Sequence, residues 1–232
     1  MILIAETAWH HDGDYNFFLN LISKICSHTK TDYIKVHISL DVDEYMHYDH
    51  PAYNAVIEKS FSINQWEKAI ETILAFNKKP MFLVNDKKAL DFCLKYNPEL
   101  VEIHSVCLND INLLEYLKNK LPDTTKIVLG VGGSSLYEIE NAVNILKRSK
   151  IILMHGFQNY PTRYEDINFK KVQKIIKLFS EYEHGYADHT AWNNEHNLSI
   201  TTMAIPLGIA YLEKHVTTLY GCERLEIGRA HV

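Results

Sequence analysis

The residues that could carry chemistry stand at the ends of short apolar segments of the sequence. His189 closely follows the seventh such segment, and His215 ends the eighth. If these two segments are neighbouring parallel strands, both imidazoles lie at one edge and can bind one divalent metal ion through neutral nitrogen atoms. A lone histidine is more often a hydrogen-bonded core residue, but the paired placement favours a metal site.

Two charged residues occupy corresponding places in the first two segments. Glu6 follows the first segment, and Lys35 lies within the second. Glu6 is predicted to be a general base or to bind a sugar hydroxyl, and a structural ion pair with Lys35 is the alternative. Lys35 is predicted to bind an anion. Burying such charges is costly unless they are paired, so their presence at strand ends argues for a function.

Other polar residues follow the remaining segments. Those predicted to bind substrate are His37, Asn85, His104, Ser105, Gln158 and Asp188. The opposite ends of the segments show no such gathering. This one-sided distribution is typical of a small-molecule enzyme whose site lies at the carboxyl ends of parallel strands. Trp9 and Trp66 are interpreted as packing residues.

The apolar segments alternate with amphipathic stretches, as β-strands and α-helices do around a parallel sheet. The predicted strands are residues 2–5, 33–38, 81–84, 100–103, 126–131, 151–155, 185–187 and 210–215. Predicted helices include residues 14–27, 64–77, 87–96, 135–148 and 168–182. Eight strands, with no GxGxxG after the first, predict a closed (β/α)8 TIM barrel of the α/β class. An open doubly wound sheet is less consistent with this pattern.

Two connections differ from the rest. Residues 39–62 form a long polar and aromatic segment, which is either a lid or a solvated insertion. Residues 130–133, Gly-Val-Gly-Gly, follow the fifth strand and form either a tight turn or a phosphate-binding loop. Both pairs of alternatives stay open at the level of the sequence.

The composition restricts the class of protein. The formal net charge is -5 without any block of like charges, which argues against a nucleic-acid partner. No stretch approaches the ~20 apolar residues that a membrane span needs, and the apolar start is too short for a signal peptide. Four cysteines without CxxC spacing suit reduced thiols. A cytoplasmic protein is expected.

The end of the chain does not complete the expected pattern. Only 17 residues follow His215 in the 232-residue chain, where a closing helix is expected. We therefore expect a barrel domain over residues 1–226 that is truncated after its eighth strand. The last six residues, 227–232, resemble the read-through translation of a sequencing adapter and are predicted to be non-native.

Four motifs resemble those of the sialic acid (N-acetylneuraminate) synthase family. Residues 6–13, ETAWHHDG, are similar to its opening E-x-G-x-N-H-x-G pattern, and residues 160–166, YPTRYED, to its YPTPYED segment. Residues 188–190, DHT, are similar to the end of its SDHT motif, and residues 213–217, EKHVT, to its EKHFT motif. Their order predicts a divergent member of this family that covers only the barrel, without the C-terminal antifreeze-like domain.

The resemblance implies a reaction and a set of roles. Members condense phosphoenolpyruvate with an N-acyl sugar aldehyde to give a sialic-acid-type ulosonic acid and phosphate. It implies that His189 and His215 bind a divalent metal ion, usually Mn²⁺, with Mg²⁺ as the alternative. It further implies that Glu6 contacts the sugar, Lys35 the phosphoenolpyruvate, and Tyr160 the bound substrates. The family precedent suggests a homodimer.

The chain also departs from the family. Glu102 stands where a second phosphate-binding lysine is usual, and Gly130 and Ala187 replace two serines. Each lost hydrogen bond to a charged group is worth roughly 1.5 to 3 kcal/mol, so anion binding needs substitutes. His104 and Arg163 are the candidates, and we hypothesise that Arg163 supplies the missing positive charge.

Two other functions therefore stay open. One is a metal-dependent sugar aldolase or isomerase on the same barrel, which the lost anion ligands favour. The other is a non-catalytic relative that binds a sugar.

Overall fold

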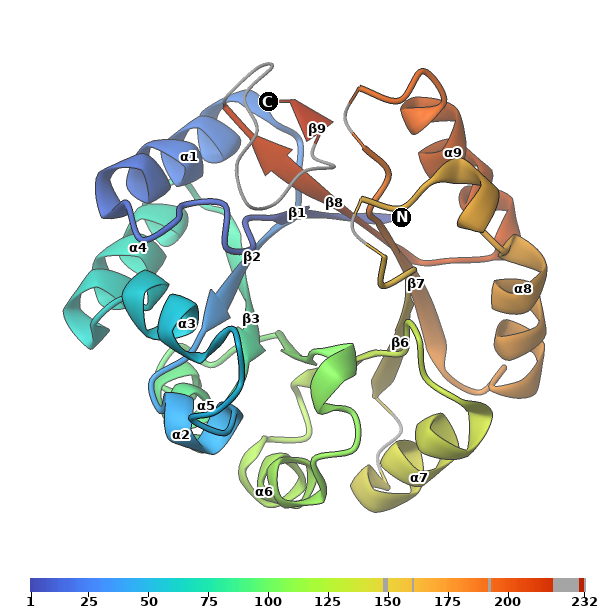
Figure 1. The fold of residues 1–232 in the computed structure, drawn as a ribbon, viewed down its shortest axis with the longest axis horizontal. Coiled ribbons are helices and arrows are strands. Elements are labelled where there is room, and N and C mark those ends of the chain that lie inside the picture. Colours follow the sequence, from blue (N-terminus) through green and yellow to red (C-terminus); the bar gives the residue numbers. More distant parts are fainter. Residues whose placement is uncertain (148–149, 160, 192, 219–229, 232) are drawn as a thin grey trace.

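Eight parallel strands form one closed sheet in the computed structural model, which describes residues 1–147, 150–159, 161–191, 193–218 and 230–231. The strands pair in sequence order, and β8 pairs with β1 to close the ring (Figure 1). Their bounds are β1 Ile2–Glu6, β2 Tyr33–Ile38, β3 Lys79–Val84, β4 Leu100–Ile103, β5 Lys126–Gly130, β6 Ile151–His155, β7 Glu183–Asp188 and β8 Tyr211–Thr217. The predicted (β/α)8 TIM barrel is confirmed.

Alternate residues of each strand face the inside of the barrel, because side chains on a strand alternate between its two faces. An apolar cluster fills the interior, with Ile4, Met81, Val128, Ile152 and Tyr211 among its members. The strand residues of opposite parity pack against the helices in a second, larger cluster. The barrel is therefore a packed core, and a cavity can form only where the inward residues become polar.

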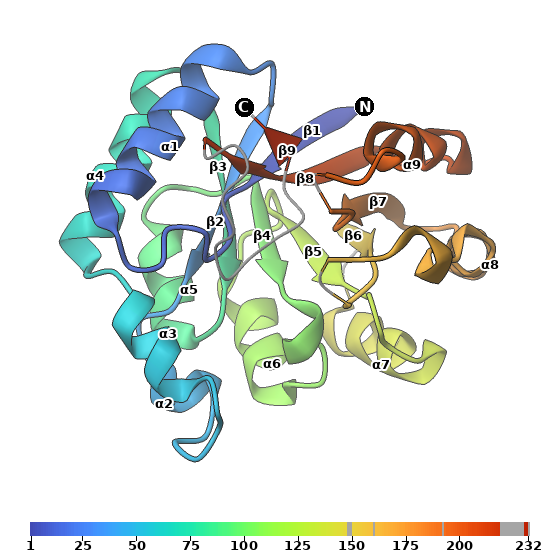
Figure 2. The same cartoon turned by 45° about the horizontal axis from the view of Figure 1, so that its top comes forward.

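The helices lie outside the ring of strands (Figure 1). The turned view shows the strands enclosed between α1 and α4 on one side and α8 and α9 on the other (Figure 2). Their bounds are α1 Tyr15–His28, α4 Ile63–Ala75, α5 Lys87–Leu94, α6 Ile111–Lys120, α7 Leu136–Leu146, α8 Phe169–Leu178 and α9 Asn197–Met203. Side-chain caps fix several helix starts. Ser135, for example, forms a capping box with Glu138 at the start of α7.

The long segment of residues 39–62 contains two short helices, α2 Val42–Tyr45 and α3 Tyr53–Lys59. Two ion pairs tie its first part to α5: Asp41 lies 2.5 Å from Lys88, and Glu44 lies 2.8 Å from Lys87. The segment is therefore partly helical and bound to the barrel. The prediction that it closes as a lid stays a prediction.

A two-residue strand, β9 Ala230–His231, pairs with the end of β8, where Val216 is opposite Ala230. The predicted domain end at residue 226 lies outside the described residues, so the proposed non-native tail stays a prediction. No helix in the described part of the chain is long and apolar enough to cross a membrane.

The outer packing of the strands should determine much of the stability. Leu153 on β6 is fully buried between the sheet and the helices. We expect Leu153→Ala to lower the free energy of unfolding by about 2 to 5 kcal/mol, because it leaves a cavity in the core. Urea unfolding followed by circular dichroism measures this. Leu198→Ala, at a leucine that is 73% exposed, is the matched control and should change stability by less than about 0.5 kcal/mol.

Candidate functional site

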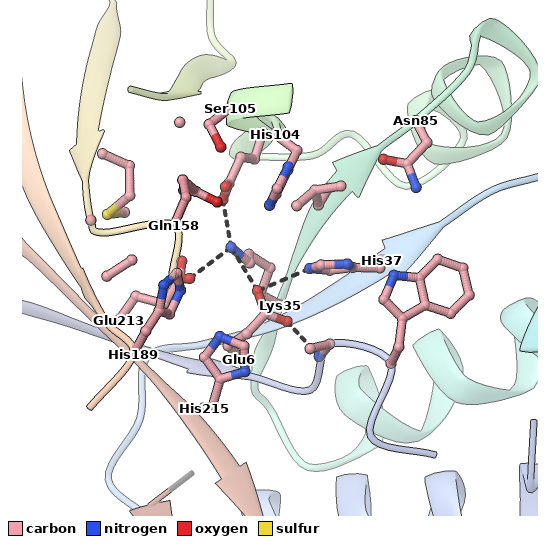
Figure 3. Close-up of a pocket in the computed structure, with 18 of the residues that line it drawn as sticks. Glu6, Lys35, His37, Asn85, His104, Ser105, Gln158, His189, Glu213 and His215 are labelled. Carbon is pink, nitrogen blue, oxygen red and sulfur yellow. Dashed lines mark hydrogen bonds and ion pairs between the residues drawn. The ribbon is translucent and has the colours of Figure 1, made fainter. Parts of the chain in front are cut away.

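A cavity of about 380 Å³ opens at the carboxyl ends of the strands, and all eight strands contribute to its lining. It brings together nine residues that the sequence predicted (Figure 3): Glu6, Lys35, His37, Asn85, His104, Ser105, Gln158, His189 and His215. These residues come from segments spread over most of the chain. Their convergence follows from the barrel topology, because parallel strands place all their carboxyl ends on one rim.

The ammonium group of Lys35 lies at the centre of three buried carboxylates (Figure 3). Its Nζ atom is 2.6 Å from Glu6 Oε2, 2.9 Å from Glu102 Oε2 and 2.8 Å from Glu213 Oε1. None of the four side chains is more than 4% exposed. One lysine therefore neutralises at most one of three carboxylates, and the cluster has an excess of negative charge when all three are ionised.

Protonation of Glu102 removes part of the excess negative charge of this cluster. Burial raises the pKa of Glu102 to about 7, and the nearby Glu213 carboxylate adds to the rise while Lys35 opposes it. Burial alone lowers the pKa of Lys35, but the carboxylates of Glu102 and Glu213 outweigh burial and raise it. Lys35 is therefore charged at neutral pH, whereas Glu102 changes between its protonated and ionised forms near pH 7.

Glu6 is held in place from both of its oxygens. Its Oε1 accepts a hydrogen bond of 2.6 Å from the backbone N–H of Ala8, and its Oε2 lies 3.2 Å from His37 Nε2 as well as beside Lys35. Ala8 has a φ of 44°, in the left-handed region that few non-glycine residues adopt. The ion pair considered for Glu6 is therefore present, and its role as a base stays a prediction.

His189 and His215 face each other at the rim, with ring centroids 5.0 Å apart and an interplanar angle of 77°. Two imidazoles that bind one metal ion at about 2.1 Å place their centroids roughly 4.5 to 5.3 Å apart. His189 Nδ1 lies 2.8 Å from the carbonyl oxygen of Phe157, so it donates there and Nε2 keeps its lone pair. Burial lowers the pKa of His189 and keeps it neutral.

The pair therefore fits two positions of a metal coordination sphere. Among the described residues, no group of three or more His, Cys, Asp or Glu side chains is arranged so that it could hold a metal ion. Any remaining ligands would come from water or substrate oxygen atoms.

Three buried oxygen atoms of the lining have no hydrogen-bond partner in the described part of the chain: Asn85 Oδ1, Ser105 Oγ and Glu213 Oε2. Buried polar atoms are nearly always hydrogen-bonded, so these three are suited to a ligand. A carboxylate oxygen can only accept, which makes a hydroxyl or ammonium group the complementary ligand for Glu213.

The loop of residues 130–133 has a structural reason for its glycines. A Cβ atom on Gly130 would lie 2.7 Å from the backbone nitrogen of Ser105, and Gly133 has a φ of 82°. Both positions therefore require glycine for close packing or for the turn. The tight-turn alternative accounts for the sequence, and phosphate binding by this loop stays untested.

Two predicted substrate-binding residues lie elsewhere, and these predictions are corrected. Asp188 points away from the cavity and pairs with Lys214, and its Oδ2 accepts a hydrogen bond of 2.5 Å from Thr201. The cause is the alternation along β7, which turns His189 inward and hence Asp188 outward. The side chain of Arg163 is 69% exposed, and its Nε donates to Asp166 at 2.9 Å. Arg163 therefore does not replace the missing positive charge.

Tyr160 lies outside the described residues, and its predicted role stays a prediction. The cavity also includes residues that the sequence analysis did not select, namely Glu213, Trp9 and Tyr45. The alternation of β8 could have identified Glu213, because Tyr211, Glu213 and His215 share one face. No such alternation identifies Trp9, which lies in a loop, or Tyr45, which ends α2.

A closed (β/α)8 barrel with converging polar residues at the carboxyl rim has the architecture of a barrel enzyme. The chain belongs to the NeuB family, whose sequence profile matches residues 28–223. An N,N'-diacetyllegionaminic acid synthase of Campylobacter jejuni subsp. jejuni is 27% identical over 238 residues, which cover 93% of this chain and 67% of that protein. A Legionella pneumophila protein of the same name is 23% identical, and the match covers 93% of this chain and 63% of that protein.

A solved structure supports the same relationship. The N-acetylneuraminic acid (sialic acid) synthetase from Leptospira borgpetersenii serovar Hardjo-bovis, crystallised with citrate, superposes with a TM-score of 0.83 at 27% identity. The match covers 94% of this chain and 73% of that one. The chain thus spans about two thirds of the length of the two synthases.

The Lys35 cluster makes a prediction about stability. Lys35→Met removes the cation from three buried carboxylates and should lower the free energy of unfolding by about 3 to 5 kcal/mol near pH 8. The loss should shrink towards pH 5, because the carboxylates then take up protons. Urea unfolding across this pH range measures both effects. Lys79→Met is the control: its partner Glu99 is an exposed carboxylate, so it should cost less than about 1 kcal/mol. Equal losses in the two variants would contradict the account.

Proposed function

We propose that the cavity condenses phosphoenolpyruvate with the open-chain carbonyl form of an N-acyl sugar, giving a sialic-acid-type ulosonic acid and phosphate. The observation that carries this proposal is the His189 and His215 pair, which lines the same cavity as the buried Glu6 and Lys35 pair (Figure 3). Relatives named as N,N'-diacetyllegionaminic acid synthases support it. The cavity volume also falls within the range of about 300 to 1,000 Å³ that small-molecule sites occupy.

The reaction forms a carbon–carbon bond when C3 of phosphoenolpyruvate attacks the sugar aldehyde carbon. Water then adds at C2 and forms a carbon–oxygen bond, and phosphate leaves as its own carbon–oxygen bond to C2 breaks. The oxygen of the water becomes the keto oxygen, and its two protons go to the former aldehyde oxygen and to the phosphate. A metal ion held by His189 and His215, Mn²⁺ or alternatively Mg²⁺, supplies Lewis-acid polarisation of the aldehyde oxygen when bound. The protein holds the two substrates in contact, which contributes much of the rate enhancement in such condensations.

The residues of the chain have distinct tasks in this proposal. Glu6, fixed by Ala8 and Lys35, accepts a hydrogen bond from a sugar hydroxyl. Glu213 Oε2 and Ser105 Oγ accept hydrogen bonds from further hydroxyl groups of the sugar. Neither oxygen has a hydrogen-bond partner among the described residues, so both are suited to a polyhydroxylated ligand. Lys35 is the only Lys or Arg among the described residues that line the cavity, and it supplies the positive charge for phosphoenolpyruvate.

One observation favours a second candidate function. Three carboxylates surround that single lysine, an environment that repels a phosphate group. A metal-dependent sugar aldolase or isomerase needs no phosphoenolpyruvate and would tolerate this charge. The two candidates differ in their products, because only the condensation releases phosphate.

Phosphate release from phosphoenolpyruvate in the presence of a panel of N-acylated sugars tests the proposal directly. We expect release that depends on both the sugar and Mn²⁺. His189→Ala and His215→Ala should each lower the rate at least about 100-fold, since loss of groups that only support metal ligands already costs 10- to 100-fold. Both should also weaken Mn²⁺ binding measured by electron paramagnetic resonance. His196→Ala, at a histidine with a 52% exposed side chain, is the control and should change neither quantity.

The alternatives have their own signatures in this assay. A new carbonyl product without phosphate would support the aldolase or isomerase and reject the condensation. Tight sugar binding without turnover would indicate a non-catalytic sugar-binding protein.

Arg163 provides a prediction that follows from its position. Its exposed guanidinium lies 3.7 Å from Glu165 and 2.9 Å from Asp166, so it is already paired outside the cavity. Arg163→Ala should therefore leave the KM for phosphoenolpyruvate within about twofold of the parent, because Arg163 is not among the described residues that line the cavity. A tenfold rise in KM would restore Arg163 as a substrate ligand.

A further inference from the structure

Glu102 occupies an unusual place for a residue in a cavity that takes an anion. It lies in β4, is 3% exposed, and lines the cavity. Its Oε2 accepts a hydrogen bond of 2.9 Å from Lys35 Nζ. No described residue bonds its other oxygen, which is available to a ligand in the cavity.

The groups that face Glu102 define its electrostatic environment. Its direct neighbours in the sheet are Leu83 on β3 and Val128 on β5, neither of which can titrate. The charged groups come from across the barrel: Lys35 on β2, with Glu6 on β1 and Glu213 on β8 bound to the same ammonium. The imidazoles that line the same cavity are those of His37, His104, His155, His189 and His215, and burial lowers the pKa of both His104 and His155 to about 3.

Ionised Glu102 would repel an incoming phosphate or carboxylate at close range. With all three carboxylates ionised, the four-residue cluster carries two negative charges in excess of its one ammonium group. A proton on Glu102 removes one of these charges. It also converts a group that can only accept hydrogen bonds into one that donates through an O–H.

We propose that Glu102 determines whether phosphoenolpyruvate binds, and that it does so as a carboxylic acid whose O–H donates a hydrogen bond to the anion. This inference rests on the proposed condensation. One proton is taken up from solution when the anion binds to the ionised form, and the same proton is released when the anion leaves. Lys35 retains its charge throughout, bound to Glu6 and Glu213.

The direction of the pH dependence follows from the pKa of Glu102, which burial raises to about 7. Below that pH the acid form predominates, and Glu102 no longer makes the affinity depend on pH. Above it, the fraction of protonated Glu102 falls tenfold per pH unit, so the Kd for phosphoenolpyruvate should rise about tenfold per unit.

The decisive variant is Glu102→Gln, which keeps the shape and a hydrogen-bond donor but cannot ionise. At pH 8.5, calorimetry should give a Kd about 30-fold lower for Glu102→Gln than for the parent, and a Kd that no longer rises between pH 7 and 8.5. A phosphate monoester itself titrates near pH 6, and the variant separates that effect from the titration of Glu102. Glu183→Gln is the matched control, because Glu183 pairs with Lys126 at the opposite end of the barrel and should retain the parent pH profile.

A second measurement needs no variant. Titration of the parent protein at pH 8 in buffers of different ionisation enthalpy should detect uptake of close to one proton per phosphoenolpyruvate bound. An uptake near zero overturns the proposal, even if Glu102→Gln fails to fold.

The outcomes separate this inference from the proposed function. A Glu102→Gln variant with the parent pH profile overturns the role of Glu102 but leaves the condensation in place. Failure of the parent and Glu102→Gln to bind phosphoenolpyruvate at any pH between 6 and 8.5, with Mn²⁺ present, overturns both.

Discussion

The ammonium group of Lys35 and the three carboxylates around it form the constraint on which the site depends. These four side chains come from β1, β2, β4 and β8, and each is buried where the apolar packing of the barrel ends. Separating a buried charge from its partner costs several kcal/mol, so the strands that carry these residues must keep their register. The same cluster thus stabilises the rim and fixes Glu6 beside His37 and the histidine pair.

The charge balance of this cluster connects structure with function. A site for an anionic substrate is expected to offer cations, yet the described residues that line this cavity include one lysine and three carboxylates. Two sources of positive charge are compatible with the geometry: a divalent ion at His189 and His215, and a proton on Glu102. The proposed condensation requires at least the first of these, whereas the alternative aldolase or isomerase requires no phosphate site at all.

Much of the fold was predictable because strand and helix periodicities are local properties of the sequence. The eight strands were found within a few residues, and the carboxyl rim followed from topology. The direction of a strand side chain can be predicted from the alternation of residues along the strand. Because His189 faces the cavity, this alternation turns its neighbour Asp188 away from it, and the prediction for Asp188 did not take this into account. The exposed pairing of Arg163 with Asp166 and the approach of Trp9 to the cavity depend on loop conformation, for which the sequence has no comparable periodicity. The carboxylate cluster required three-dimensional contacts between residues far apart in the sequence, because Glu102 and Glu213 lie 67 and 178 positions from Lys35.

Calorimetry of phosphoenolpyruvate binding at pH 8, with and without Mn²⁺, tests whether anion binding in this cavity needs a metal cation in addition to Lys35. We expect Mn²⁺ to tighten binding at least about tenfold, because a cation close to the anion offsets the excess negative charge of the Lys35 cluster. Binding of phosphoenolpyruvate with the same affinity in the presence of a chelator would contradict this expectation, since a cation at His189 and His215 would then contribute nothing to anion binding.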